Sequence, residues 1–264
     1  MNQEKYLLID IGNSRMKWNI WWRGARHFAR DTQIVDYKPQ AIERVLDNEW
    51  QDVETAVNAI LIANVAGESI AQQVAAWCVG HWGIDPQFIT SGASFHSVRN
   101  GYREHRQLGV DRWLAVIAAQ QLCPDQDIIV IDCGTATTVD TLTRNGQHYA
   151  GPIMPGCQLM QRALLANTAA LNLASGDHDS MSVYVENTQN AIISGVNFAA
   201  SSALNTIVSQ IRRKLSDELG DSEAKVIVTG GAAQQLMPLT QINHSIVEPD
   251  LVLIGLRRLA GEKQ

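Results

Sequence analysis

The chain has 264 residues, of which 45% are hydrophobic and 18% charged, and its formal net charge is −6. This length allows two lobes of about 100 to 150 residues each, and the composition is that of a globular protein, which excludes a disordered chain. The negative charge argues against nucleic acid as a partner, and no continuous apolar run approaches the roughly 20 residues of a membrane helix. We therefore expect neither nucleic acid nor a membrane as a partner.

The N-terminus and the cysteines indicate a cytoplasmic protein. Residues 1–5 lead directly into a strand-like segment, without the basic and apolar regions of a secretory signal. None of the cysteines forms a C-x-x-C pair, which argues against a zinc site. Their surroundings are apolar, as expected for small core residues of a reduced protein; they are Cys78, Cys123, Cys133 and Cys157.

The first predicted unit is a strand, a turn and a second strand. The apolar run 6–9 ends at Asp10, residues 11–14 form the turn, and apolar residues alternate with polar ones from Met16 to Trp22. A further buried strand is predicted at 59–63, followed by a small-residue turn and a helix to about Cys78. These elements place Asp10 at the mouth of a tight turn.

A central helix is predicted from Asp111 to Leu122, where apolar residues recur at helical spacing. Cys123-Pro124-Asp125 ends it. We place the boundary between the lobes there, which gives an N-terminal lobe of residues 1–122 and a C-terminal lobe of residues 123–264.

The second lobe repeats the plan of the first. An apolar run at 128–131 ends at Asp132, residues 133–136 form a turn, and the β-branched stretch 137–142 is the return strand. Residues 225–229 then match 59–63 as a strand before a small-residue turn. Repeats at this spacing predict two similar lobes rather than a solenoid. A long helix is expected from Gln189 to Leu219, ending at Gly220.

The two Asp-x-Gly turns suit phosphate chemistry. A carboxylate at a strand end can hold a hydrated magnesium ion, and the glycine lets a phosphate approach the backbone. Asn13 or Thr135 can then bind a phosphate oxygen. One such turn alone is most simply a β-turn, but two with the same flanking strands favour the functional interpretation. The sequence contains no P-loop motif, and no Rossmann fingerprint follows the first strand.

The start of the central helix allows two interpretations. Asp111 in Gly109-Val110-Asp111-Arg112 can be a helix N-cap, or a general base that accepts a hydroxyl proton beside an anion-binding Arg112. Spacing alone leaves both open. Tyr102 is uninformative by itself, and Thr188 is most simply an N-cap.

Taken together, these motifs resemble the type III pantothenate kinases. The specific part is the combination of G-x-D-R with D-x-G-T-A-T-T, and the motifs run through almost the whole chain. In order they are Asp10-Ile11-Gly12-Asn13-Ser14, Gly109-Val110-Asp111-Arg112, Asp132-Cys133-Gly134-Thr135-Ala136-Thr137-Thr138, Pro155-Gly156, Asn187-Thr188 with Ser194-Gly195, and Thr229-Gly230-Gly231.

The resemblance implies an α/β fold of two duplicated ribonuclease-H-like, actin-like lobes with the active site in the cleft between them. It implies a homodimer whose long C-terminal-lobe helix pairs with its mate. The implied reaction moves the γ-phosphate of ATP to the primary hydroxyl of pantothenate, giving 4'-phosphopantothenate in the first step of coenzyme A biosynthesis. The implied cofactors are Mg²⁺ with the ATP and a monovalent cation, K⁺ or NH₄⁺.

The resemblance also implies roles for individual residues. Asp111 is the expected proton acceptor, and Asp132 the expected ligand of the monovalent cation. Thr188 would complete the substrate site of the neighbouring subunit. The expected ATP contacts are Asp10, Ile11, Gly12, Asn13, Ser14, Arg15, Met16, Lys17 and Thr135. The expected pantothenate contacts are Tyr102, Gly109, Val110, Asp111, Arg112 and Thr188.

Two alternatives stay open at this point. One is another actin-like phosphotransferase with a different small hydroxyl or carboxylate acceptor. The other is a non-enzymatic accessory role in transcription, against which the intact Asp10, Asp111, Asp132 and Thr135 argue. Measuring ATP consumption with and without pantothenate distinguishes these alternatives from pantothenate phosphorylation.

Overall fold

The structure is a computed structural model that describes residues 4–50, 53, 57–166, 181–220 and 223–262. The chain divides into two compact units. The first consists of Met1–His96, Tyr102–Ala118 and Asp250–Gln264, and the second of Ser97–Gly101 and Ala119–Pro249. The units therefore do not follow the chain as two consecutive halves, because the C-terminal segment packs with the first.

The first unit contains a five-stranded sheet in the order β3-β2-β1-β4-β5. Strands β1, β2 and β3 pair antiparallel, whereas β4 and β5 run parallel to β1. The continuous apolar run of β1 places it at the centre of the sheet, buried on both faces. The strands span Lys5–Ile11 (β1), Arg15–Trp22 (β2), Gln33–Asp36 (β3), Ala59–Asn64 (β4) and Gln87–Phe88 (β5).

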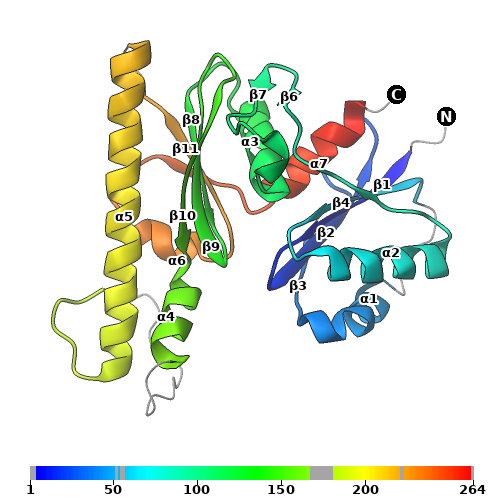
Figure 1. Ribbon diagram of the computed structural model, residues 1–264, viewed down its shortest axis with the longest axis horizontal. Coiled ribbons are helices and arrows are strands. Elements are labelled where there is room, and N and C mark those ends of the chain that lie inside the picture. Colours follow the sequence, from blue (N-terminus) through cyan, green and yellow to red (C-terminus); the bar gives the residue numbers. More distant parts are fainter. Residues whose placement is uncertain (1–3, 51–52, 54–56, 167–180, 221–222, 263–264) are drawn as a thin grey trace. The chain divides into compact units, whose positions relative to one another are not determined.

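Helices cover both faces of this sheet (Figure 1). Helices α1 (Ile42–Trp50) and α2 (Glu68–Trp82) pack with one face through a core that includes Trp50 and Trp77. The first part of α3 (Val110–Leu122) and α7 (Leu251–Glu262) pack with the other face. Alternate residues of β1 therefore enter different cores, as the two-residue period of a strand requires.

The second unit contains a five-stranded sheet in the order β10-β9-β8-β11-β12. Strands β8, β9 and β10 pair antiparallel, and β11 and β12 run parallel to β8. This is the order of the first sheet, strand for strand. The strands span Ile128–Cys133 (β8), Ala136–Leu142 (β9), His148–Pro155 (β10), Lys225–Thr229 (β11) and Ser245–Val247 (β12).

Helix α5 (Thr188–Leu219) lies along one face of the second sheet and appears in yellow to orange in Figure 1. Its Ala200, Leu204 and Val208 pack on Ile129, Ile131 and Val139 in one apolar core. Helix α6 (Ala233–Leu236) contributes to the same core, and α4 (Cys157–Ala166) packs against α5. The predicted long helix is confirmed, beginning one residue earlier than expected.

Shorter elements connect these parts. Strands β6 (Ser94–Phe95) and β7 (Val98–Arg99) form a two-stranded sheet. The 3-10 helices are η1 (Pro39–Ala41), η2 (His105–Gln107) and η3 (Met237–Leu239).

Among the described residues, one helix is long and apolar enough to cross a membrane by length and composition, namely α5. The expectation from the sequence concerned a continuous apolar run of membrane length, and α5 has none. It passes the test on mean hydropathy because its apolar residues, many of them alanines, are interleaved with small polar ones. Of its most apolar 18-residue window, 44% is buried inside the protein, and the core helix of a globular domain passes the same test. This is weak evidence for a span.

The duplication predicted from the two Asp-x-Gly motifs is confirmed by the identical strand orders, since both motifs close the turn after the first strand of their sheets. The turns differ by one residue. Asp10 pairs with Lys17 across the first, and Asp132 with Thr138 across the second. The division into lobes at residues 122 and 123 stays a prediction.

Candidate active site

The first Asp-x-Gly turn connects β1 to β2. The N–H of Gly12 donates to the carbonyl oxygen of Arg15 at 2.9 Å, which closes the turn. Asn13 is exposed at its tip, while Asp10 is half-buried at the strand end. The side chains of Ile11 and Met16 lie fully in the core, so these two predicted ATP contacts could offer only their backbone.

Charged side chains flank this turn. Arg15 forms an exposed ion pair with Asp36, with 2.6 Å between Nε and Oδ1. Such a pair contributes little to stability because both charges stay solvated. The guanidinium can therefore exchange its carboxylate for a phosphate at small cost.

Tyr37 holds the same turn and was missed by sequence reasoning. Its hydroxyl donates to the carbonyl oxygen of Gly12 at 2.6 Å, and its N–H donates to that of Ser14 at 3.2 Å. Burial, and secondarily the negative charge of Asp10, raise the pKa of Tyr37 to about 12. The phenol therefore stays a donor at neutral pH. No local motif marks this residue, because its position depends on the pairing of β3 with β2.

The second Asp-x-Gly turn connects β8 to β9 and is built from three segments. The N–H of Gly134 donates to Ala136 at 3.1 Å, and the N–H of Gly156 donates to Thr135 at 2.9 Å. Gly230 lies against Asp132, with φ of +92°. A Cβ there would collide with a carboxylate oxygen of Asp132 and lie 2.6 Å from the Cys133 nitrogen, so only glycine fits.

The thiol of Cys133 follows the Asp132 carboxylate in this turn. Burial raises the pKa of the Cys133 thiol to about 12, and electrostatic repulsion from Asp132 and Cys157 adds to the shift. Thr135, a predicted ATP contact, is exposed in the same turn. A carboxylate among oxygen-bearing groups is a donor set that suits a hard cation such as K⁺ or Mg²⁺. Within the described ranges, no group of three or more metal-ligating side chains gathers.

The start of α3 brings three predicted substrate residues together. Asp111 is the second residue of the helix, so the N-cap interpretation is wrong; its carboxylate accepts the N–H of Arg112 at 2.8 Å. The guanidinium of Arg112 donates to the hydroxyl of Tyr102 at 3.3 Å, although ten residues separate them. Arg112 is 5% exposed, which means that its charge is largely withdrawn from water. Val110 faces the core and could contribute only its backbone.

Helix α7 fixes the position of α3. A Cβ on Gly255 would lie 2.8 Å from the carbonyl carbon of Leu114, so the two helices touch backbone to backbone. Arg258 donates to the carbonyl oxygen of Ile117 at 2.9 Å. The end of the chain therefore supports the helix that carries Asp111 and Arg112.

Thr188 is the first residue of α5 and is exposed. It is not the N-cap, because the side chain of Asn187 accepts the N–H of Asn190 at 2.8 Å. Its hydroxyl is therefore not needed as a cap for the helix.

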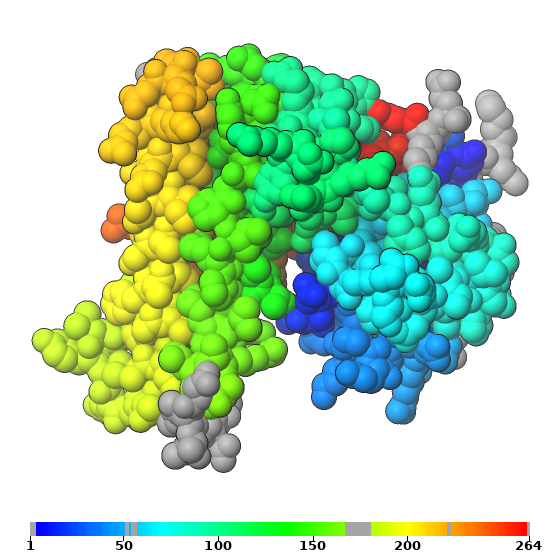
Figure 2. All heavy atoms as spheres, viewed as in Figure 1, coloured from blue at the N-terminus to red at the C-terminus, as the bar shows by residue number. Residues whose placement is uncertain are grey.

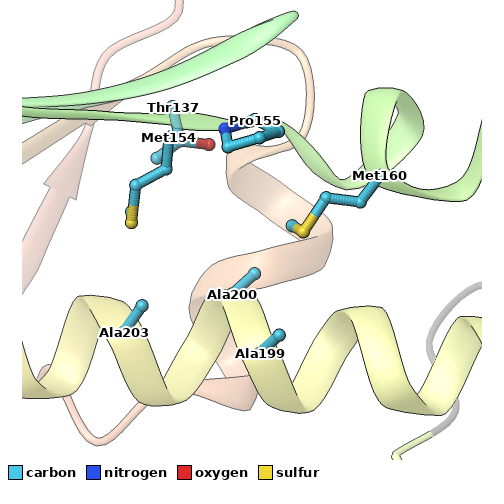
Figure 3. A pocket seen from close by; sticks show the side chains of 7 residues that line it. All are labelled: Thr137, Met154, Pro155, Met160, Ala199, Ala200 and Ala203. Carbon is cyan, nitrogen blue, oxygen red and sulfur yellow. The ribbon is translucent and has the colours of Figure 1, made fainter. Parts of the chain in front are cut away.

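A cavity of about 180 Å³ in the second unit lies between β10, α4 and α5 (Figure 3). The side chains of Met154 and Met160 extend toward the alanines of α5. Thr137 contributes a hydroxyl to the lining, and the other lining side chains are apolar. The cavity therefore offers no charged group that could bind a phosphate. The lining residues are Thr137, Met154, Pro155, Met160, Ala199, Ala200 and Ala203.

Solved structures share the fold of this chain. A conserved Baf family protein from Campylobacter jejuni has a TM-score of 0.59 at 20% identity, with 97% of this chain and 98% of that chain covered. The ethanolamine utilization protein EutJ from Carboxydothermus hydrogenoformans has a TM-score of 0.52 at 13% identity, with 97% and 90% covered. At these identities the likeness concerns the fold alone.

Sequence relatives define the family. The type III pantothenate kinase from Nitrosococcus oceani is 34% identical over 260 residues, which cover 97% of this chain and 94% of that protein. The type III pantothenate kinase from Aromatoleum aromaticum is 37% identical over 256 residues, covering 97% and 98%. The family pattern described as type III pantothenate kinase matches residues 6–210. This chain therefore belongs to the type III pantothenate kinase family and is an ATP-dependent kinase.

Proposed function

We propose that this chain transfers the γ-phosphate of ATP to the primary hydroxyl of pantothenate, with Asp111 as the proton acceptor. The observation that carries the proposal is the cluster of Asp111, Arg112 and Tyr102 at the start of α3, in a chain with two Asp-x-Gly turns. Membership of the family names the substrate.

Asp111 has the chemistry of a general base. A carboxylate can take the hydroxyl proton as the oxygen attacks phosphorus, and the proton then rests on a carboxylate oxygen. Arg112 supplies a cation for an anionic group of the substrate, in a site where low exposure strengthens the attraction. Tyr102 fixes the guanidinium through its hydroxyl, and Gly109 leaves space beside the Asp111 carboxylate.

The two turns serve ATP. Phosphoryl transfer depends on positioning and charge neutralisation more than on covalent chemistry by the protein. Residues 10–17 offer backbone N–H groups and the side chains of Asn13, Ser14 and Lys17, and Thr135 offers a hydroxyl. Mg²⁺ bound with the nucleotide would neutralise phosphate charge, and Asp10 is the residue proposed to hold its hydration shell.

Asp132 is the proposed ligand of a monovalent cation. A carboxylate near phosphates would repel them, and a bound cation reverses the sign of that interaction. The negative charge of Asp132 acts on the neighbouring thiol, because it adds to the burial that raises the pKa of Cys133.

The active form is proposed to be a homodimer that pairs through α5. Its exposed side carries small residues that allow a second helix to approach closely, and α5 lies open along the second unit in Figure 2. Thr188 at its start would complete the partner's substrate site. Light scattering should give the mass of two chains, whereas a fully active monomer would rule out the shared site.

We assign the enzyme to the cytoplasm, where ATP is available. The four cysteines are free thiols, and burial raises the pKa of Cys78 to about 12, as expected for inert core thiols.

The test is a coupled ATPase assay with potassium present, run across a panel of small hydroxyl and carboxylate acceptors. We expect pantothenate to raise the rate of ATP consumption more than any other acceptor in the panel does. A higher kcat/KM for a sugar or a carboxylate would favour another phosphotransferase, and no acceptor-dependent turnover would favour a non-enzymatic role.

A further inference from the structure

A buried histidine holds the segment that leads to Tyr102. The N–H of Gly101 donates to Nδ1 of His148 at 3.3 Å, and Nε2 of His148 lies 2.9 Å from Oδ1 of Asp140. His148 is 0% exposed and Asp140 is 2% exposed. Because Nδ1 accepts a hydrogen bond from a backbone N–H, the ring N–H lies at Nε2, which donates a hydrogen bond to the carboxylate.

Ser97, Arg99 and Gly101 each contact the turn before β10 or its first residue, and β7 lies beside the end of the β9–β10 hairpin in Figure 1. Arg99 forms a bridge with Gln147, and its N–H donates to Gly146 at 2.8 Å. Glycines permit the close approach at both ends. A Cβ on Gly146 would lie 2.8 Å from the carbonyl carbon of Ser97, and one on Gly101 would collide with the carbonyl oxygen of His148.

The next residue after this clamp is Tyr102, whose hydroxyl accepts the guanidinium of Arg112. The backbone before Tyr102 is therefore fixed by His148, while the end of the Tyr102 side chain meets the substrate cluster. A contact that fixes Gly101 restricts where that phenol can lie.

We infer that His148 is a positioning residue for pantothenate binding, which acts through Gly101 on Tyr102 and Arg112 without touching the substrate. The inference rests on the proposed function, because it takes Tyr102 and Arg112 as pantothenate contacts. It predicts an effect on the KM for pantothenate and none on the KM for ATP.

Two substitutions of His148 separate its two hydrogen bonds. His148→Asn keeps an acceptor, Oδ1, near the place of Nδ1 and loses the contact with Asp140. His148→Gln reaches Asp140 and loses the acceptor for Gly101. We expect His148→Gln to raise the KM for pantothenate about 3- to 10-fold, the equivalent of one lost hydrogen bond, and His148→Asn to stay within about twofold of wild type.

The matched control for stability is Leu215→Ala. It removes a buried side chain from the apolar core of the same unit, on α5 and not on the hairpin that holds the clamped segment. This variant should lower the melting temperature and leave both KM values unchanged. A rise in its pantothenate KM equal to that of His148→Gln would assign the effect to stability and overturn the inference.

Gly101→Ala tests the clamp without changing the histidine, and covers the case in which His148 variants fail to fold. It should raise the KM for pantothenate, whereas Gly92→Ala, whose Cβ would meet an atom at an ordinary 3.5 Å, should not. Wild-type values for His148→Gln or Gly101→Ala, or equal rises in His148→Gln and His148→Asn, would overturn the positioning role. Absence of wild-type turnover with pantothenate would instead overturn the proposed function, and this inference with it.

Discussion

The hydroxyl of Tyr37 donates a 2.6 Å hydrogen bond to the carbonyl oxygen of Gly12, so a residue from beyond β3 fixes the turn proposed to bind ATP phosphates. The N–H of Tyr37 holds Ser14 as well. Two bonds from one residue thus set the direction in which the backbone N–H groups of this turn point.

Tyr37→Phe should weaken ATP binding. It removes the bond to Gly12 and leaves the bond from the backbone, so the expected loss is about 1 kcal/mol, or about fivefold in the KM for ATP. The matched control is Tyr6→Phe, which removes a hydroxyl bonded to Glu4 in the same unit. Steady-state kinetics with ATP varied checks this. An unchanged KM for ATP in Tyr37→Phe would show that the bond does not position the turn.

Tyr37 should also make stability depend on alkaline pH. Its pKa is raised from 10.0 to about 12, so the folded state holds the phenol proton more tightly than the unfolded chain. The stability that this raised pKa contributes is fully present below the pKa of 10.0 of the unfolded chain, and it is lost as pH rises toward the folded-state pKa of about 12. The difference in unfolding free energy between wild type and Tyr37→Phe should therefore stay constant up to about pH 9 and shrink between about pH 10 and about pH 12 in urea titrations. A constant or widening difference would contradict it.

Gly230→Ala should damage the second turn. Its φ of +92° disfavours a side chain, and the new Cβ would collide with Asp132. We expect a destabilisation of about 3 kcal/mol from backbone strain plus overpacking. Gly83→Ala is the control, because its φ of +66° lies in the left-handed helical region with nothing within 4 Å, and it should cost only about 1 kcal/mol. Equal losses in thermal unfolding would mean that the contact with Asp132 adds nothing.

Turnover should require a monovalent cation held by Asp132. Rates in potassium should exceed those in a bulky organic cation at equal ionic strength by about tenfold or more, given the charge that the cation offsets. Asp132→Ala should lose this dependence, whereas Asp140→Asn, a change elsewhere in the same sheet, should keep it. Full potassium dependence in Asp132→Ala would place the cation elsewhere.

The sequence predicts most of the fold, because the signals for it are local. Buried apolar runs ending at Asp10 and Asp132 mark the central strands, and their repetition indicates the duplication that the two sheets share. The cluster of Tyr102 with Arg112 followed from the family resemblance, since ten residues separate them in the chain.

Features that depend on distant contacts could not be predicted. Tyr37 reaches Gly12 through strand pairing, and α7 reaches α3 because Gly255 permits close approach. The clamp between Gly101 and His148 joins residues 47 positions apart. The predicted cap of α5 was wrong for another reason. Asn187 and Thr188 can both cap a helix, and a helix start that lies one residue earlier makes Asn187 the cap.

The central claim is tested most directly by identifying the phosphorylated product made by wild type and by Asp111→Asn. The substitution keeps the size and a hydrogen-bonding oxygen but removes the basicity of the carboxylate. With ATP, Mg²⁺, potassium and pantothenate, phosphorus NMR should show wild type placing phosphate on the primary hydroxyl, and Asp111→Asn about 100-fold slower with its ATP affinity retained. Near-wild-type turnover by Asp111→Asn, or phosphate on another group, would contradict the account.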